Sequence, residues 1–423
     1  MNLSHRMEQQ LPRPLLELVI DISTLATGRS ERVYLVGGIV RDLLLQYRNL
    51  DIDLVVEGDA VGLARNLAES GKAELLAQHH FGTATLKHGE YTVDMATARK
   101  ETYAHPGALP EVAPGTIRDD LARRDFSINA MAVSLSPDDR GELIDLHGGR
   151  ADLEQRLIRI LHPGSFRDDA TRILRGVRYE QRLGFEFEEQ TAGLLRRDVP
   201  MLDTISGDRI RNELELILRE KEPEHAIRRL ADLGALSGLG LTAGVSDGID
   251  EMFGEARKLS RTGELSTLYF CLLVHSTTVD GLEAFVARLN MSAGPSRAMR
   301  DTLRLKNNLH LLERPSLKPS EVYGLLQEYG AVAIEANAIA SRSSAARGNL
   351  ERFLAELRHV KPSLNGEDLK KLGIPPGPEM GRILSALRRA RLDGEVDTRA
   401  AEERLARSLL AGDDNAGRRP QRE

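Results

Sequence analysis

Two features within residues 35–55, a pair of adjacent glycines and a period-two pair of aspartates, constrain this chain most. Alternate residues of a strand share a face, so Asp51 and Asp53 should point the same way from a strand with apolar, buried flanks. Neighbouring carboxylates repel each other unless a positive charge lies between them. A divalent cation is the simplest such charge, and Mg²⁺ binds through a few carboxylates together with phosphate oxygens.

The glycines add a phosphate site to this prediction. Gly37 and Gly38 let backbone amides approach a phosphate group at the start of a helix. With the aspartates as metal ligands, the segment predicts a nucleotidyl-transfer site, in which metal ions activate the attacking hydroxyl and neutralise the leaving pyrophosphate. A purely structural pairing of the aspartates with Arg41 or Arg48 is the alternative. It is disfavoured because carboxylates are costly within a run of Leu, Ile and Val.

The length and the cysteine content of the chain indicate how many domains it has and which compartment suits it. A chain of 423 residues exceeds one ordinary core, so we expect roughly two to four domains. The single cysteine, Cys271, excludes an internal disulfide and suits a reducing compartment. Without a long apolar run or a signal-peptide core, the sequence predicts a cytoplasmic protein with no membrane span.

The charge distribution is uneven. The whole chain has a net charge of −6, yet Ser341–Glu423 holds 17 Lys and Arg against 13 Asp and Glu. A mildly basic end beside an acidic, metal-binding half is compatible with RNA binding, although the signal is weak.

Hydrophobic periodicity divides the chain into two kinds of structure. Up to about residue 160, short apolar strands alternate with helices, which predicts an α/β domain. Beyond Ile160 the pattern is helical, with segments expected near residues 168–183, 207–220, 223–234, 281–289, 296–312, 319–340 and 346–358. Residues 99–116 carry three prolines and two glycines, so we expect a long irregular loop that is a functional lid or disordered.

Two further segments of the first domain carry candidate site residues. Asp94, in the strand TVDMATAR, is expected at the floor of the site as an auxiliary catalytic carboxylate, or as a carboxylate held by Arg99 or a strand amide. In RRDFSINA, Arg123 and Arg124 suit a triphosphate clamp because Arg binds phosphate bidentately, with Arg124 the stronger candidate. Asp125 either joins this nucleotide site or caps a helix.

The helical segment FRDDATRILRGVRYEQRL predicts a base-reading element. Asp169 and Arg172 are three residues apart, hence expected on one helical face, and Arg175 and Arg178 continue it. A carboxylate accepts from the exocyclic amine of cytosine or adenine, whereas an adjacent guanidinium donates to ring acceptors. Such a pair selects C and A against G and U, while the later arginines reach phosphates or brace the pair. Salt bridges within the helix, such as Asp168 with Arg172, are the alternative.

Together these segments resemble the bacterial class of tRNA nucleotidyltransferases and poly(A) polymerases, in the polymerase-β-like nucleotidyltransferase superfamily. LVGGIVRD with DID is similar to the family's metal motif, and RRDFSINA to its ribose and triphosphate motif. IDLHGGRADL, at 144–153, is similar to its hinge, DDATRILRGVR to its amino-acid template and SGDRIRNELELIL, at 206–218, to its neck helix. Order and spacing agree over about residues 33–220.

The resemblance implies an α/β polymerase-β-like head followed by an all-helical neck, body and tail. We place an N-terminal helix at 1–30, the catalytic head at 31–160, the neck with its template at 161–225, the body at 226–350 and the RNA-binding tail at 351–423. The resemblance also implies Mg²⁺ as cofactor, CTP and ATP as substrates, and tRNA held by its acceptor stem and T-arm. The implied nucleotide-binding and metal-binding positions are Gly38, Arg41, Asp51, Asp53, Arg124, Asp169, Arg172, Arg175 and Arg178. Gly37 and Asp125 join the nucleotide-binding candidates on the local pattern described above.

One departure from the family pattern occurs at the start of the template. The family usually has Glu-Asp there, whereas this chain has Asp168-Asp169. Because the base-reading Asp169 is retained, we expect the change to matter little.

The motifs leave the added nucleotides open. Addition of CCA, of CC or of A alone, and polyadenylation all share these residues, although a tail of only +4 disfavours poly(A) synthesis. A non-catalytic RNA-binding protein on the same fold, or a nucleotidyltransferase of small molecules or proteins, fits the motifs less well. A looser prediction is that GIPPGPEMGRIL, at 373–384, contacts RNA through a helix start and Arg382.

Overall fold

The computed structural model describes residues 1–79, 82–105, 107–108, 110–241, 248–260 and 264–416. The chain forms two compact units, Met1–Gly238 and Leu239–Glu423, which are described separately. Among the described residues, no helix combines the length and apolar character needed to cross a membrane.

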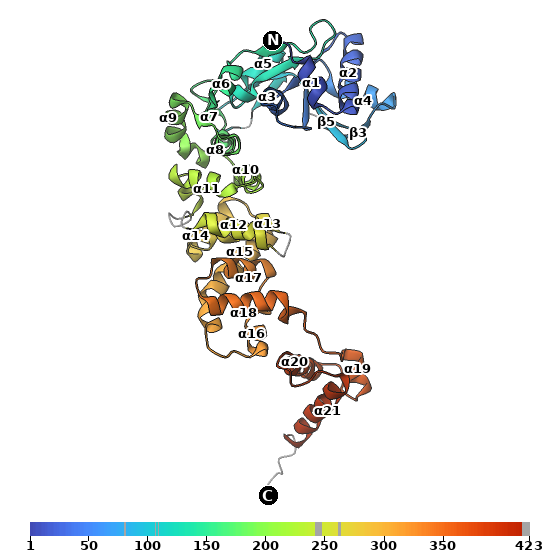
Figure 1. Cartoon of the computed structure of the whole chain (residues 1–423), viewed down its shortest axis with the longest axis vertical. Helices are drawn as coiled ribbons and strands as arrows, with labels where there is room; N and C mark the ends of the chain where they lie inside the picture. Colours follow the sequence, from blue (N-terminus) through green and yellow to red (C-terminus); the bar gives the residue numbers. More distant parts are fainter. Residues whose placement is uncertain (80–81, 106, 109, 242–247, 261–263, 417–423) are drawn as a thin grey trace. The chain divides into compact units, whose positions relative to one another are not determined.

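A seven-stranded mixed sheet forms the centre of the first unit (Figure 1). β1 runs antiparallel to β2 and to β8, whereas β2 and β5 run parallel. Residues 33–36 of β1 are all buried, because both faces of the central strands are covered. Across the sheet the strands lie in the order β3 (Glu74–His79), β4 (Thr83–His88), β5 (Tyr91–Thr97), β2 (Ile52–Glu57), β1 (Arg32–Val36), β8 (Met131–Ser134) and β9 (Leu143–Asp145).

Helices cover this sheet and connect its strands. Tyr34, Val36 and Val55 pack with Ile117 and Leu121 of α5 in one buried cluster. α2 and α4 pack against each other, α2 also against β1 and α4 also against β4 and β5. The bounds are α1 (Ser4–Gln10), α2 (Arg13–Gly28), α3 (Gly38–Leu45), α4 (Ala60–Glu69), α5 (Ile117–Ala122) and α6 (Gly149–Gln155).

The expectation of an irregular loop at 99–116 was wrong. Its two ends form an antiparallel ribbon of β6 (Arg99–Thr102) and β7 (Glu111–Pro114). The prolines and glycines around these strands hid their pattern in the sequence. The side chains of β6, RKET, nevertheless alternate in exposure, as expected for a strand of a ribbon. Residues 106 and 109 of this segment lie outside the described residues.

Beyond the sheet, the first unit is helical as predicted, apart from the short paired strands β10 (Leu157–Ile158) and β11 (Glu186–Phe187). α8 lies against both α10 and α11. The expectation that Asp169 and Arg172 share a helical face was wrong, because Asp169 has an extended backbone between α7 and α8. The bounds are α7 (Ser165–Asp168), α8 (Thr171–Leu183), α9 (Glu189–Asp198), α10 (Gly207–Leu218) and α11 (Pro223–Asp232).

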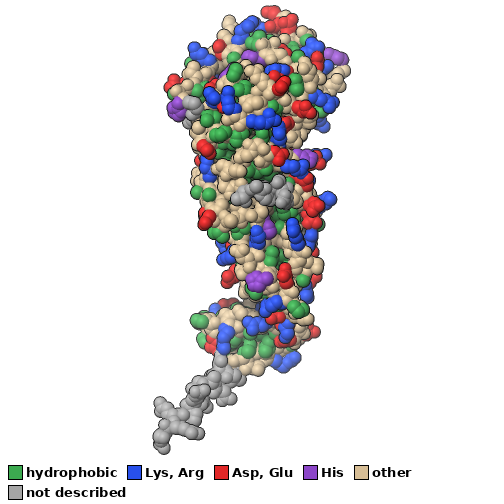
Figure 2. All heavy atoms as spheres, turned by 90° about the vertical axis from the view of Figure 1, so that its left-hand side faces the viewer, with side chains coloured by type: hydrophobic (Ala, Val, Ile, Leu, Met, Phe, Trp, Pro, Cys, Tyr) green, Lys and Arg blue, Asp and Glu red, His purple; other side chains and the backbone are tan. Residues whose placement is uncertain are grey.

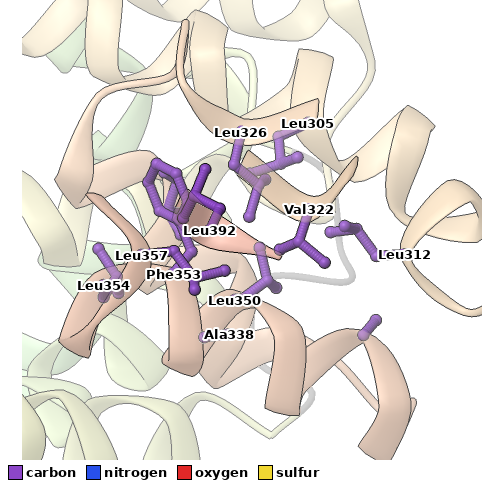
Figure 3. Packing of buried hydrophobic residues seen from close by; sticks show 12 residues of the cluster. Leu305, Leu312, Val322, Leu326, Ala338, Leu350, Phe353, Leu354, Leu357 and Leu392 are labelled. Atoms are coloured by element: carbon purple, nitrogen blue, oxygen red, sulfur yellow. The ribbon is translucent and has the colours of Figure 1, made fainter. Parts of the chain in front are cut away.

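The second unit is built from helices around apolar clusters. In the cluster of Figure 3, Leu305 packs with Leu326 from one neighbouring helix and with Leu350 and Phe353 from another, and Leu392 belongs to the same cluster. The bounds are α12 (Ile249–Leu259), α13 (Leu265–Val274), α14 (Val279–Arg288), α15 (Ala293–Asn308), α16 (Pro319–Leu326), α17 (Ala331–Ala340), α18 (Ser344–Ala355), α19 (Gly366–Lys371), α20 (Pro378–Leu392) and α21 (Arg399–Ala416).

These observations confirm the predicted α/β head with a largely helical remainder. The helix predicted over 319–340 is in fact two helices, α16 and α17, separated by residues 327–330. The sequence also predicts a break between subdomains at residues 237–249, which are rich in glycine. Residues 242–247 of this segment lie outside the described residues. The five-part division of the chain stays a prediction.

Candidate active site

The turn between β1 and α3 brings backbone close to an arginine. Gly37 has φ +76°, a conformation that favours glycine, and a Cβ placed there would lie 2.9 Å from Nη1 of Arg124. Gly38 begins α3 and lines the same cavity as that guanidinium, so the start of the helix faces this space. The arrangement suits an anionic phosphate group, as the sequence predicted.

Three carboxylates lie near this turn. Asp51 precedes β2 and is exposed, whereas Asp53 is half-buried within it. Asp94 is directly opposite Asp53 in the parallel pairing of β2 with β5, and accepts a 2.6 Å hydrogen bond from Oγ1 of Thr85. This hydroxyl, rather than the predicted Arg99 or a strand amide, holds Asp94.

The donor set fits a divalent cation. Burial, and then the charge of Asp51, raise the pKa of Asp53 to about 6, although Arg124 acts in the opposite direction and Asp94 adds a smaller increase. Clustered carboxylate oxygens whose repulsion is only partly relieved are the ligands that Mg²⁺ prefers. In the described part of the chain, no group of three or more His, Cys, Asp or Glu has the geometry of a complete metal cage. A cation held here would need ligands in addition to the carboxylates of Asp51 and Asp53.

Arg123 and Arg124 are held by one buried carboxylate that the sequence analysis did not single out. Asp120 of α5 is fully buried and accepts from Nη2 of Arg123 at 2.6 Å and from Nη2 of Arg124 at 2.9 Å. Arg123 also donates to Glu101 of β6 at 3.1 Å. The ribbon is thereby linked to the predicted triphosphate clamp. The signal for Asp120 was its spacing, three and four residues before the two arginines.

Asp125 forms a buried ion pair with the second arginine of α8. Its Oδ2 accepts from Arg175 Nη2 at 2.6 Å and Nε at 2.9 Å, and its Oδ1 from the Phe126 amide and the Asn129 side chain. Burial alone would raise the pKa of Asp125, but the charge and hydrogen bonds of Arg175 hold it below its ordinary value. Asp125 thus fixes α8 to the head.

The predicted base-reading pair is held from several sides. Arg172 is buried and donates to the Ser165 hydroxyl at 2.6 Å and to the Arg123 carbonyl at 2.8 Å. Asp169 accepts from Arg209 Nη2 at 2.7 Å and from Thr171. Arg209 comes from α10, forty residues away, and spacing could not have found it.

These groups converge on one cavity of about 420 Å³ in the first unit. It brings together nine of the predicted residues: Gly37, Gly38, Asp53, Arg123, Arg124, Asp125, Asp169, Arg172 and Arg175. A second hollow of about 350 Å³ contains Asp94 and also touches Asp53 and Arg124. The large cavity also contains residues that were not predicted, namely Arg99, Glu101, Tyr103, Asn129, Tyr179 and Arg209.

Two predicted nucleotide ligands lie behind the cavity wall. Arg41 is buried and pairs with Asp42, and its guanidinium lies 5.4 Å from the centre of the Tyr179 ring. Arg178 lies 5.0 Å from the same ring centre and pairs with Glu213. Both therefore support the Tyr179 ring, and the predicted bracing of the base-reading pair by Arg178 stays a prediction. Direct contact of either residue with nucleotide stays a prediction.

The predicted RNA contact at Arg382 lies in the second unit. Its side chain is exposed on α20, with Glu379 at 3.9 Å. On the face shown in Figure 2, basic and acidic side chains are interspersed rather than separated. An RNA contact here stays a prediction.

Two family descriptions match the chain. Residues 33–159 match the poly A polymerase head domain. Residues 184–240 match a probable RNA- and SrmB-binding site of polymerase A. The first covers the sheet and the clamp, and the second covers α10 and α11.

Named relatives extend this likeness over the whole chain. The A-adding tRNA nucleotidyltransferase of Geobacter sulfurreducens is 35% identical over 95% of this chain and 48% of its own length. That of Halalkalibacterium halodurans is 33% identical over 97% of this chain and 96% of its own. The CC-adding enzyme of Deinococcus radiodurans is 33% identical over 91% of both chains. This chain thus spans about half of the Geobacter relative, but nearly all of the other two.

A solved structure agrees with these relatives. The Thermotoga maritima CCA-adding enzyme in complex with tRNA aligns with a TM-score of 0.78 at 31% identity, over 97% of this chain and 98% of that chain. Related CCA-adding structures contain ATP or CTP. The cavity with its carboxylates and clamp thus lies on the fold of known nucleotide-adding enzymes, and the chain belongs to the tRNA nucleotidyltransferase family.

Proposed function

We propose that this chain extends the 3′ end of tRNA with nucleotides from CTP or ATP, and that the nucleotide it adds is the terminal A. The single observation that carries the proposal is the shared cavity, in which the Gly37 turn and Asp53 face the same space as Asp169 and Arg172. A phosphate site and a base-reading pair that line one cavity suit a nucleoside triphosphate. Three relatives named as A-adding enzymes support the choice of A.

In this reaction the RNA 3′-hydroxyl attacks the α-phosphate in line, and pyrophosphate leaves. Asp51 and Asp53 would hold Mg²⁺, which when bound supplies charge neutralisation around the reacting phosphate. The amides at Gly38 and the Arg124 guanidinium bind and orient the triphosphate, so that little reorganisation is needed during the reaction.

We assign the choice of base to Asp169 and Arg172. Asp169 accepts a hydrogen bond from the exocyclic amine of adenine or cytosine, and Arg172 donates to ring acceptors. Guanine and uracil present a carbonyl oxygen to Asp169, which an ionised carboxylate cannot satisfy. This chemistry admits A and C alike, so it does not itself choose between them.

Complete CCA addition is the second candidate. It is favoured by the Thermotoga CCA-adding enzyme, with which 97% of this chain aligns. Under both candidate functions, the acceptor stem and T-arm of tRNA would bind along the helical part of the chain. The single cysteine, Cys271, is buried and suits a cytoplasmic enzyme.

The test uses three tRNA transcripts that end at the discriminator base, in CC or in CCA. Each is incubated with Mg²⁺, ATP and CTP, one of the two nucleotides being labelled, and the products are sized on a sequencing gel. One A added to the CC transcript, with no C added to the shortest, supports A addition. Three additions to the shortest transcript support CCA addition. Two C additions alone, an unlimited A ladder or no product would overturn both.

A further inference from the structure

We propose that Arg209 is a positioning residue for base selection, which fixes the carboxylate of Asp169 so that one oxygen faces the incoming base. This inference rests on the proposed function. Neither the family motifs in the sequence nor the comparisons assign a role to Arg209. Its guanidinium comes from the first turn of α10, outside the segment that carries the predicted base-reading pair.

The carboxylate of Asp169 is held asymmetrically. Its Oδ1 accepts from Nη2 of Arg209 at 2.7 Å, from the backbone amide of Thr171 at 2.9 Å and from the Thr171 hydroxyl at 2.6 Å. Within the described residues, no hydrogen bond to Oδ2 is formed. The asymmetry therefore leaves Oδ2 as the oxygen that can meet a ligand in the cavity.

Thr171 alone cannot define this orientation. Both of its donors come from the residue two positions along the chain, so they hold Oδ1 near the start of α8 but leave the carboxylate plane to turn about that anchor. Arg209 approaches from another helix and supplies a contact with a sequence separation of 40. A second, distant anchor of opposite charge removes that rotation.

The partner of Asp169 is already rigid without Arg209. Arg172 is buried and is tied to the Ser165 hydroxyl and to the Arg123 carbonyl. Asp169 is more accessible, with 22% of its side chain exposed, and the Arg209 side chain is 25% exposed beside it in the same cavity. Arg209 therefore acts on the more exposed member of the pair.

Selectivity should depend on this restraint. A fixed acceptor opposite the exocyclic amine rewards A or C and repels the carbonyl oxygen of G or U. If the carboxylate can turn aside, a wrong base no longer meets that oxygen, whereas the triphosphate keeps its separate contacts at Arg124. Loss of Arg209 should thus lower discrimination more than it weakens nucleotide binding.

The experiment compares the nucleotide that the unmodified enzyme adds with its carbonyl counterpart, ATP against GTP or CTP against UTP. For Arg209→Gln the ratio of kcat/KM values should fall at least about tenfold, while KM for the correct nucleotide changes by less than about threefold. Arg209→Lys keeps the charge but not the planar fork, so its ratio should fall less, by about threefold or more.

Arg211→Gln is the matched control. Arg211 lies on the same helix with 22% of its side chain exposed, and pairs with Asp208 at 2.8 Å, outside the cavity lining. Its ratio should equal that of the unmodified enzyme. Thermal melting of each variant reports folding, and if Arg209→Gln melts below the assay temperature, Arg209→Lys carries the test.

The inference is overturned if the Arg209 variants keep the original ratio, or if Arg211→Gln lowers it equally. No addition of any nucleotide by the unmodified protein would instead overturn the proposed function. The two failures are therefore distinguishable.

Discussion

Asp53 on β2 and Asp94 on β5 lie directly opposite each other in two parallel strands. The Thr85 hydroxyl takes up one oxygen of Asp94, whereas Asp53 lines both the large cavity and its neighbour. Because Asp53 lines both hollows, the proposed metal site depends on it most. Asp51 lies two residues before it in the chain, and Asp94 lies opposite it on β5.

Asp53→Asn should abolish nucleotide addition, because a neutral amide cannot hold the metal charge that stabilises the reacting phosphate. We expect kcat to fall by at least about a hundredfold, with tRNA binding unchanged in a filter-binding assay. The control is Asp21→Asn, which removes a surface carboxylate paired with Lys72. Clear residual turnover in Asp53→Asn would contradict the metal assignment.

Gly37→Ala should damage the triphosphate site. The new Cβ would lie 2.9 Å from Arg124 Nη1 and would sit on a backbone with φ +76°. We expect kcat/KM for the nucleotide to fall by about tenfold or more, mainly through KM. Gly28→Ala is the matched control, since nothing lies within 4 Å of a Cβ at that position. Equal kinetics for both variants would show that the turn does not position Arg124.

The functional residues could be predicted from the sequence where they lie close together in one short segment. The Gly37 turn, the strand with Asp53 and the Arg124 clamp each depend on residues within about fifteen positions, so period and spacing suffice. β6 and β7 were missed because their pairing closes across a segment rich in proline and glycine. Local composition there concealed a long-range pairing.

The other differences arise from tertiary contacts. Spacing alone placed Asp169 on α8, but its carboxylate instead accepts hydrogen bonds from Thr171 and pairs with Arg209 on α10. Spacing likewise put Arg178 in line with Arg172. The Tyr179 ring and Glu213 hold Arg178 away from the cavity. A contact between residues forty positions apart has no signature in a single sequence.

Asp169→Asn should change base choice in a defined direction. The amide adds a donor where the carboxylate only accepts, so the carbonyl oxygen of guanine or uracil gains a partner. We expect misincorporation of GMP or UMP to rise by about tenfold or more relative to the correct nucleotide. The check is single-nucleotide addition with each of the four triphosphates. Unchanged selectivity would remove Asp169 from base recognition.

His275 should make the second unit sensitive to mild acid. It follows α13, and its Nε2 is buried with no hydrogen-bond partner among the described residues. Burial, and then the charge of Lys306, lower its pKa to about 4, although Asn337 acts in the opposite direction. The folded state therefore disfavours the protonated ring.

The sign follows from the two pKa values. An unfolded histidine takes up a proton below about pH 6.5, whereas the folded one does so only near pH 4. Stability is therefore lost as the pH falls through this window, by about 2 kcal/mol between pH 7 and pH 5. Chemical unfolding of His275→Gln at the two pH values should show that much less loss than the unmodified protein. His310→Gln, at an exposed position, serves as the control. An equal pH-dependent loss in His275→Gln and the unmodified protein would contradict the buried neutral ring.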